Sequence, residues 1–187
     1  MRAFVAVDVP SPDVGTGLTP GSPTHLTLAF LGEVADDRVP ELVAAVRDGV
    51  GAAAPFELVL AGTGAFPSRS HPRIVFADIG EGRAALEAIA GTVRAALTAH
   101  RFGFDGKPFV PHLTLLRVRG LRDVPLARRL LDTPPGRELG RHRVGELLLK
   151  SSELGPGGAR HRVVARYPLV GASPRAGEPG TPPGDAR

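Results

Sequence analysis

The stretch THLTLAFLGEV (Thr24–Val34) decides how the chain is expected to fold. Its run of apolar residues predicts a β-strand, and the side chains of a strand point alternately to two faces. His25 and Thr27 then share one face, while the neighbouring leucines share the opposite face with Phe30. Such a strand anchors one side in a core and presents an imidazole and a hydroxyl together on the other side.

The same pattern returns in PHLTLLRVRGL (Pro111–Leu121), where His112 follows His25 by 87 residues. His112 and Thr114 again share a face opposite to leucines. Two near-identical tetrads in a similar context favour an internal duplication, which predicts two similar lobes whose polar faces meet across a groove. The alternative is coincidence in a leucine-rich chain, and it predicts that the two histidines lie far apart.

Strand-like and helix-like segments alternate along the rest of the chain. Strands are expected at residues 3–9, 25–32, 56–66, 73–79, 112–118, 144–154 and 161–169, and helices at 36–50, 81–102 and 123–132. The third of these strands is expected to break at its glycines, and the glycine-rich turn at 155–160 predicts a hairpin. This mixture predicts an α+β fold: a bilobal pseudo-twofold duplication with antiparallel sheets lining a central cleft and helices outside.

The composition limits the class of protein. The 187 residues include no cysteine, which excludes thiol catalysis, cysteine metal sites and a disulfide framework. Residues 1–170 are expected to form one domain of two lobes, and the Gly/Pro-rich residues 171–187 a disordered tail. The N-terminus lacks the apolar core of a signal peptide, and no segment approaches the roughly 20 apolar residues that span a bilayer. We therefore expect a soluble, cytoplasmic protein without a membrane partner.

The net charge of +4 comes almost entirely from arginine, since Lys107 and Lys150 are the only lysines. The planar arginine side chain forms paired hydrogen bonds to phosphate oxygens. The abundance of Ala, Gly, Pro and Arg also fits a plain compositional bias of the genome. No dense basic tract is present, so the sequence does not require a long nucleic-acid footprint.

Paired histidines and threonines suit acid–base chemistry at phosphorus. Histidine titrates near neutral pH, so one ring can accept a proton from an attacking oxygen while the other donates a proton to the leaving oxygen. Threonine hydroxyls can hydrogen-bond the non-bridging phosphate oxygens and offset the charge that grows in the transition state. His25, His112, Thr27 and Thr114 are therefore the candidate site residues.

The chain resembles the 2H phosphoesterase superfamily, whose mark is two His-x-Thr/Ser-x motifs. Within it the chain looks like the bacterial and archaeal RNA 2′,3′-cyclic phosphodiesterases, once called 2′-5′ RNA ligases. The resemblance covers most of residues 1–170 and is carried by MRAFVAVDVP, HLTLAFLGEV, GAFPS, FVPHLTLLRV and SELGPGGARH. It implies a bilobal fold with the two motifs facing each other, and hydrolysis of a ribose 2′,3′-cyclic phosphate at an RNA end to a 2′-phosphate.

The resemblance also implies roles for single residues. His25 corresponds to the proton donor and His112 to the proton acceptor, although the symmetry of the two motifs leaves these roles open when the residues are considered alone. Thr27 and Thr114 correspond to phosphate-binding residues. Arg117 matches an arginine common in these enzymes, but regular alternation puts it on the face opposite to His112. Arg117 therefore reaches the phosphate only if the strand ends, twists or bulges.

The resemblance implies neither a metal nor an organic cofactor, and we expect a monomer that binds RNA or a nucleotide with a 2′,3′-cyclic phosphate end. Two other functions use the same residues: the reverse reaction, which joins RNA through a 2′-5′ linkage, and a binding module for RNA ends that has lost activity. Intact histidines in both motifs favour catalysis.

The chain also differs from its relatives. They usually place a helix and a short strand between the opening strand and the first motif, whereas here 14 residues of loop-like composition separate Pro10 from His25. Relatives often have an aromatic residue in place of His161. Together with the other histidines outside the motifs, His161 is expected to be solvated or structural, and Asp8 is a candidate for a place beside the groove.

Overall fold

The computed structural model describes residues 1–14, 23–155 and 158–171. Its strands are β1 (Arg2–Pro10), β2 (Pro23–Glu33), β3 (Phe56–Pro67), β4 (Pro72–Ile79), β5 (Leu113–Arg117), β6 (Glu138–Val144), β7 (Glu146–Gly155) and β8 (Gly158–Pro168). The helices are α1 (Val39–Val50), α2 (Arg83–Ala99) and α3 (Val124–Leu131), with short 3-10 turns at Asp36–Arg38 and Leu121–Asp123.

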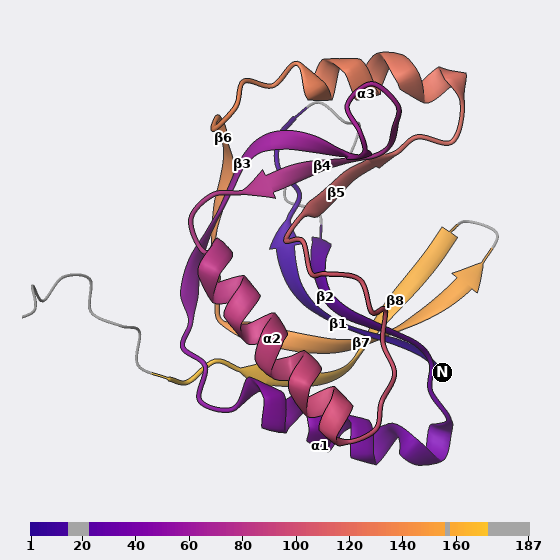
Figure 1. Cartoon of the computed structure of the whole chain (residues 1–187), viewed down its shortest axis with the longest axis vertical. Coiled ribbons are helices and arrows are strands. Elements are labelled where there is room, and N and C mark those ends of the chain that lie inside the picture. Colours follow the sequence, from indigo (N-terminus) through magenta and orange to yellow (C-terminus); the bar gives the residue numbers. More distant parts are fainter. Residues whose placement is uncertain (15–22, 156–157, 172–187) are drawn as a thin grey trace, which may run out of the picture.

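The strands form two antiparallel sheets of four strands each. One sheet has the order β2-β1-β7-β8 and carries the first motif, and the other has the order β5-β4-β3-β6 and carries the second. In Figure 1 the first sheet curves through the lower part of the molecule and the second through the upper part, with α3 above it. The predicted α+β class with two antiparallel lobes is confirmed.

Two details of the prediction are wrong. The glycines of β3 do not break the strand, because the pairing with β4 resumes at Thr63 after an irregularity and continues to Pro67. The strand β6 was not predicted, since its sequence ELGRHRV is largely polar and lacks the alternation of a half-buried strand. It forms the edge of its sheet by backbone pairing with β3.

The division into a domain of residues 1–170 and a disordered tail of residues 171–187 stays a prediction. Residues 172–187 lie outside the described part of the chain, and Gly171 donates a backbone hydrogen bond to the Ala53 carbonyl. No helix in the described ranges is long and apolar enough to cross a membrane.

The duplication extends beyond the motif strands to their neighbours. The strand β1 reads FVAVDV from Phe4, and β4 reads IVFADI from Ile74. Each of these strands pairs with the motif strand of its own lobe, β1 with β2 and β4 with β5. An aspartate occupies the same repeat position in both, as Asp8 and Asp78. The two lobes therefore share the motif strand, its partner and an acidic residue on that partner.

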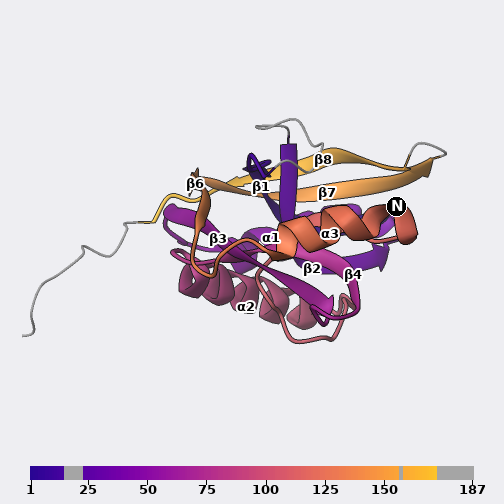
Figure 2. The same cartoon turned by 90° about the horizontal axis from the view of Figure 1, so that it is seen from above.

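One continuous core joins the two lobes. The inner face of β1 contributes Val5 and Val7 to the same buried cluster as Leu42 of α1 and Leu86 of α2. The two helices lie against each other in Figure 2 as in Figure 1, and a side chain at Gly49 of α1 would meet the α2 backbone. Because α1 and α2 pack this closely, they cover the core side of both sheets together.

The connection between β1 and β2 is short, as the sequence indicated. In the other lobe the corresponding connection, between β4 and β5, contains α2. Residues 11–14, the part of the first connection that the structure describes, contain no helix. Val5, Val7 and Val9 are nevertheless buried, so the pair of helices from elsewhere in the chain supplies the cover that a local helix would give.

The segment between α2 and β5 fastens the outer edge of β2. Arg94 of α2 donates hydrogen bonds from Nε to the Leu28 carbonyl (3.0 Å) and from a terminal nitrogen to the Lys107 carbonyl (2.9 Å). The Asp105 amide donates to the Phe30 carbonyl at 2.9 Å. These contacts satisfy carbonyl groups that an edge strand leaves open and hold the second lobe's connection against the first motif.

The close contact between α1 and α2 gives a matched test of this packing. A Cβ at Gly49 would lie 2.6 Å from the Val93 Cα, whereas a Cβ at Gly91 meets nothing within 4 Å. Gly49→Ala should lower the free energy of unfolding by about 1–3 kcal/mol through overpacking. Gly91→Ala, on the exposed side of α2, should raise it by about 0.5–1 kcal/mol because alanine favours helix. Urea denaturation of both variants measures the two effects, and equal effects would contradict the packing described.

Candidate active site

His25 lies among aromatic rings and charges on one face of the first sheet. In the β1–β2 ladder it stands opposite Asp8. Its ring centroid is 5.1 Å from that of Phe4 and 4.9 Å from that of His161, which approaches edge-on from β8. We call this face of the sheet, with Phe4, Asp8, His25 and His161, the first motif face.

The environment of His25 strongly favours its neutral form. Burial is the main cause that lowers its pKa from 6.5 to about 4, and the nearby His161, Lys150 and Arg117 lower it further while Asp8 opposes them. Burial and the Lys150 charge also lower the pKa of His161, against the opposing influence of the Ser151 backbone and Asp8. Two adjacent imidazoles therefore stay neutral to lower pH than an exposed histidine does.

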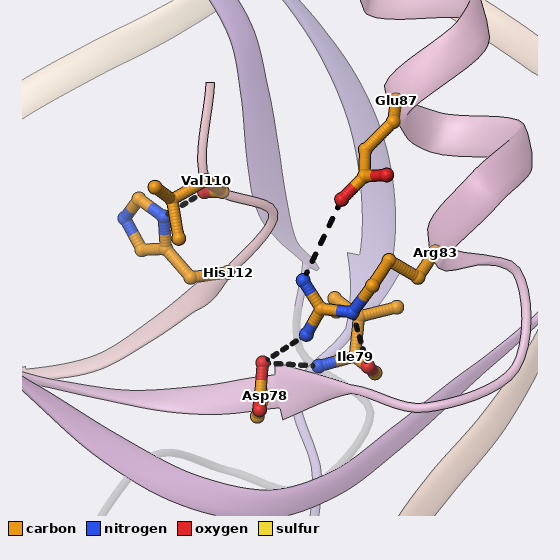
Figure 3. Close-up of polar contacts among 6 residues, drawn as sticks. All are labelled: Asp78, Ile79, Arg83, Glu87, Val110 and His112. Carbon is orange, nitrogen blue, oxygen red and sulfur yellow. Dashed lines mark hydrogen bonds and ion pairs between the residues drawn. The ribbon is translucent and has the colours of Figure 1, made fainter. Parts of the chain in front are cut away.

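His112 is held by the backbone just before its strand. Its Nδ1 donates a 2.7 Å hydrogen bond to the Val110 carbonyl, which leaves Nε2 of the neutral ring with a free lone pair. Phe66 and Phe76 approach the imidazole at centroid distances of 5.1 and 5.4 Å. Figure 3 shows the ring above the start of β5, with the Val110 carbonyl beside it. The residues Ile74, Phe76, Asp78, His112 and Thr114 define the second motif face.

A glycine in β3 makes room for this aromatic support. Gly64 pairs with Phe76 across the β3–β4 ladder, and a Cβ at Gly64 would lie 2.4 Å from the Phe76 ring. Phe76 and Phe66 stack with centroids 4.5 Å apart. The glycine that was expected to break the strand therefore lets the Phe66 and Phe76 rings stack on each other, and both rings meet His112 edge-to-face.

Each motif strand contains the same bulge, three residues after its histidine. In β2 the register shifts so that Thr27 pairs with Ala6 and Ala29 with Val5, which leaves Leu28 as the extra residue. In β5 the corresponding extra residue is Leu115. A bulge reverses the alternation beyond it, so the residue five places after each histidine returns to the motif face.

The bulge brings Arg117 to the second motif face. Arg117 pairs with Ile74, which shares the face of Phe76 and Thr114, so the condition stated for its participation is met. The equivalent residue of the first motif is Phe30, which pairs with Phe4. The prediction that Phe30 lies opposite to His25 is therefore wrong, because strict alternation does not hold beyond Leu28. The Arg2 guanidinium lies over the Phe30 ring at 5.0 Å.

The two motif faces lie close enough to interact electrostatically. The charge of Arg117, on the second sheet, helps to lower the pKa of His25 on the first, and β2 and β5 contact each other between the two sheets. Thr27 pairs with Ala6 on the first face and Thr114 pairs with Phe76 on the second. The structure thus gathers the five candidate residues on two neighbouring faces, contrary to the alternative of a coincidental repeat.

The repeated aspartates are each bound by a basic residue instead of by the histidine. Lys150 of β7 contacts both carboxylate oxygens of Asp8, at 2.6 and 2.9 Å. In the other lobe Arg83 contacts Asp78 at 2.5 Å and lies 3.8 Å from Glu87. Figure 3 shows Arg83 between these two carboxylates, with the His112 imidazole turned away from them.

Sequence reasoning missed two members of the site. His161 was expected to be solvated or structural, yet it contacts His25 and Phe4. Its distance from the first motif in sequence hides this contact, although its departure from the aromatic residue of relatives was a usable signal. Lys150 carried no signal beyond being one of two lysines. Within the described ranges, no three His, Asp or Glu side chains are grouped in a way that would hold a metal ion.

Comparison with known proteins gives consistent matches. The family model described as the 2′-5′ RNA ligase superfamily matches residues 11–152. An RNA 2′,3′-cyclic phosphodiesterase of Aeropyrum pernix is 35% identical over 133 residues, covering 70% of this chain and 73% of that protein. The crystal structure of TT0787 of Thermus thermophilus superimposes with a TM-score of 0.71 at 28% identity, covering 92% of this chain and 100% of that one.

A second solved structure has a nucleotide in its description. The crystal structure of Escherichia coli LigT complexed with 3′-AMP matches with a TM-score of 0.68 at 26% identity. The match covers 90% of this chain and 98% of that chain.

The lowered pKa of His25 predicts how stability depends on pH. Between about pH 4 and 6.5 the unfolded chain binds a proton at His25 that the folded chain does not, so stability is highest above 6.5 and falls as the pH approaches 4. The loss from this residue amounts to about 3 kcal/mol. The variant His25→Gln has no titrating group at this position. Its free energy of unfolding should therefore fall less between pH 7 and 4 than that of the wild type. Parallel curves would show that His25 titrates normally.

Proposed function

Because the chain belongs to the 2′-5′ RNA ligase superfamily, we propose that it hydrolyses 2′,3′-cyclic phosphate ends of RNA or nucleotides to 2′-phosphomonoesters. Its membership confirms the resemblance drawn from the paired motifs. The observation that carries the proposal is the pair of equivalent half-sites, each with a histidine and a threonine on one face, joined by Arg117, which the bulge turns toward them.

His112 is the proposed proton acceptor. Its Nδ1 is engaged by the Val110 carbonyl, so Nε2 is the atom that can take a proton from water. The water oxygen then forms a bond to phosphorus, and the bond between phosphorus and the ribose O3′ breaks in line with it. His25 donates a proton to O3′, which leaves a free 3′-hydroxyl and a 2′-phosphate. Return of the proton from His112 to His25 through solvent restores the starting state.

The proposed donor must be protonated when the bond breaks, whereas the pKa of about 4 makes His25 neutral in the free protein. A cyclic phosphate carries one negative charge. At about 4 Å and an effective dielectric constant near 20, that charge favours the protonated ring by about 4 kcal/mol, which corresponds to about three pKa units. Substrate binding can thus raise the pKa of His25 from about 4 to near neutral pH, where the ring carries the proton that it donates.

Thr27, Thr114 and Arg117 are the proposed phosphate-binding groups. Both hydroxyls can donate to non-bridging oxygens, and the guanidinium adds a fixed positive charge as the phosphorus gains negative charge. The described residues form no ion pair with Arg117 that would occupy it. Its charge is already close enough to His25 to affect that ring, which supports its place beside the reacting phosphate.

The proposed chemistry requires neither a metal nor an organic cofactor, since the two histidines carry both protons. It also requires only one copy of the chain, because both motifs lie in the same polypeptide, and we propose that the protein acts as a monomer. The absence of cysteine suits the reducing cytoplasm, which we propose as its compartment.

The direct test is hydrolysis of a nucleoside 2′,3′-cyclic phosphate in the presence of EDTA. His25→Ala and His112→Ala should each lower kcat by about 10²–10⁴, the usual contribution of one acid–base group. His100→Ala is the matched control, because this ring pairs with Asp48 on the helix side of the molecule, and it should retain the wild-type rate. Unchanged rates in both motif variants would overturn the mechanism.

The same assay separates the three functions left open by the sequence. Accumulation of the 2′-phosphate supports the proposed hydrolysis. Joining of RNA halves that carry a cyclic phosphate and a 5′-hydroxyl would show that the site also runs in the ligase direction. Tight binding of the cyclic phosphate without any turnover would identify a binding module and contradict the proposal.

A further inference from the structure

Lys150 is unusual among the charged side chains of this protein. It is only 7% exposed and is the one buried charged residue in the described part of the chain. Both of its short contacts go to the Asp8 carboxylate, at 2.6 and 2.9 Å. Removing a lysine from water is costly, and an apolar pair of similar volume often serves stability as well. Stability alone therefore does not explain the presence of this ion pair.

The ion pair lies directly beside the proposed proton donor. Asp8 is opposite His25 in the β1–β2 ladder, and Lys150 pairs with Phe4, whose ring contacts His25. Neither charged group forms a hydrogen bond with the His25 ring that would fix its proton. The pair therefore acts on His25 through its charges, with the carboxylate favouring the protonated ring and the ammonium opposing it.

Among the described residues, the titratable groups that act on the pKa of His25 can be named. They are Asp8 from β1, Lys150 from β7, His161 from β8 and Arg117 from β5. Of the undescribed segments, residues 15–22 and 156–157 contain no titratable side chain, whereas residues 172–187 contain two arginines and two acidic residues. The set holds one anion against two permanent cations and a second imidazole, so the free site carries an excess of positive charge.

The second lobe lacks this arrangement. Asp78 occupies the repeat position of Asp8, but its partner Arg83 is about one-third exposed and also lies near Glu87. The charge of Asp78 is thus neutralised in a partly solvated cluster that also includes Glu87. Only His25, the proposed donor, has a buried cation next to it, which breaks the symmetry between the two half-sites.

We propose that Asp8 and Lys150 are positioning residues that set the proton affinity of His25 in opposite directions, so that His25 stays neutral until an oxyanion enters the site. This inference rests on the proposed function for its purpose, and it concerns a property of the free protein. The positive charge of Lys150 adds to burial in keeping the proton off His25 while the site is empty, and it attracts the phosphate whose negative charge then favours the protonated ring. Asp8 holds the Lys150 ammonium in place and partly offsets its effect on the proton affinity of His25.

Opposite signs distinguish this role from a structural one. Lys150→Met leaves the Asp8 charge unopposed, so the pH at which His25 titrates should rise by about one unit or more. Asp8→Asn leaves Lys150 unopposed and should move that pH downward. A merely structural pair predicts lower stability in both variants without opposite shifts of one histidine. Lys150→Arg keeps the charge and should restore the titration of the wild type.

The measurement is an NMR titration of the histidine rings, with the His25 signal assigned by its loss in His25→Gln. Lys107→Met is the matched control, because Lys107 is the only other lysine and its side chain is 85% exposed; it should leave the His25 signal unchanged. Sodium sulfate, whose charge is constant over the titration, serves as the oxyanion. It should raise the pH at which His25 titrates in the wild type and raise it less in Lys150→Met.

The outcomes separate this inference from the proposed function. Shifts of the same sign in Lys150→Met and Asp8→Asn, or no effect of sulfate on His25, would overturn the inference. If either single variant fails to fold, the double variant D8N/K150M decides, because a neutral pair should place the His25 titration between those of the wild type and a free histidine. Opposite shifts in a protein that fails to hydrolyse cyclic phosphates would leave this inference standing and remove the proposed function.

Discussion

One extra residue in each motif strand controls which side chains reach the site. A regular strand would put the residue five places after the histidine into the core, where an arginine has no partner. The bulges at Leu28 and Leu115 turn that residue back to the motif face and send two successive residues toward the core. At the first of these bulges Arg94 of α2 donates a hydrogen bond to the Leu28 carbonyl. The position of the bulge thus links the residues of the motif face, the residues of the core face and the contact with α2.

The parts of the fold that follow from simple alternation could be read from the sequence. His25 with Thr27, and His112 with Thr114, were expected on shared faces, and the ladders place them there. Alternation cannot reveal a bulge, however, because HLTL reads as a regular strand in both copies. The place of Phe30 was therefore wrong, and that of Arg117 could be stated only as a condition. The polar edge strand β6 was missed for a related reason, since backbone pairing leaves no apolar pattern to detect.

Contacts between distant segments form the other limit of sequence reasoning. His161 and Lys150 belong to the hairpin of β7 and β8, far from the first motif along the chain, and they reach His25 only because β7 pairs with β1. Gly64 was interpreted as a break, whereas it provides the space that the Phe76 ring needs beside His112. In both cases the identity of the neighbour decides the role of the residue, and that neighbour is set by the order of strands in the sheet.

The two lobes differ at the position five residues after the histidine, which is Phe30 in one lobe and Arg117 in the other. This difference bears on which of the two ester bonds of a cyclic phosphate is broken in the proposed reaction. A 2′,3′-cyclic phosphate presents two ester oxygens that are related by near-symmetry about the phosphorus, and a perfectly twofold site would bind it equally well in the two orientations that exchange these oxygens. Regioselectivity therefore has to come from whatever distinguishes the lobes. Under the proposed function, an aromatic ring on one side and a guanidinium on the other make the two orientations of this ester inequivalent.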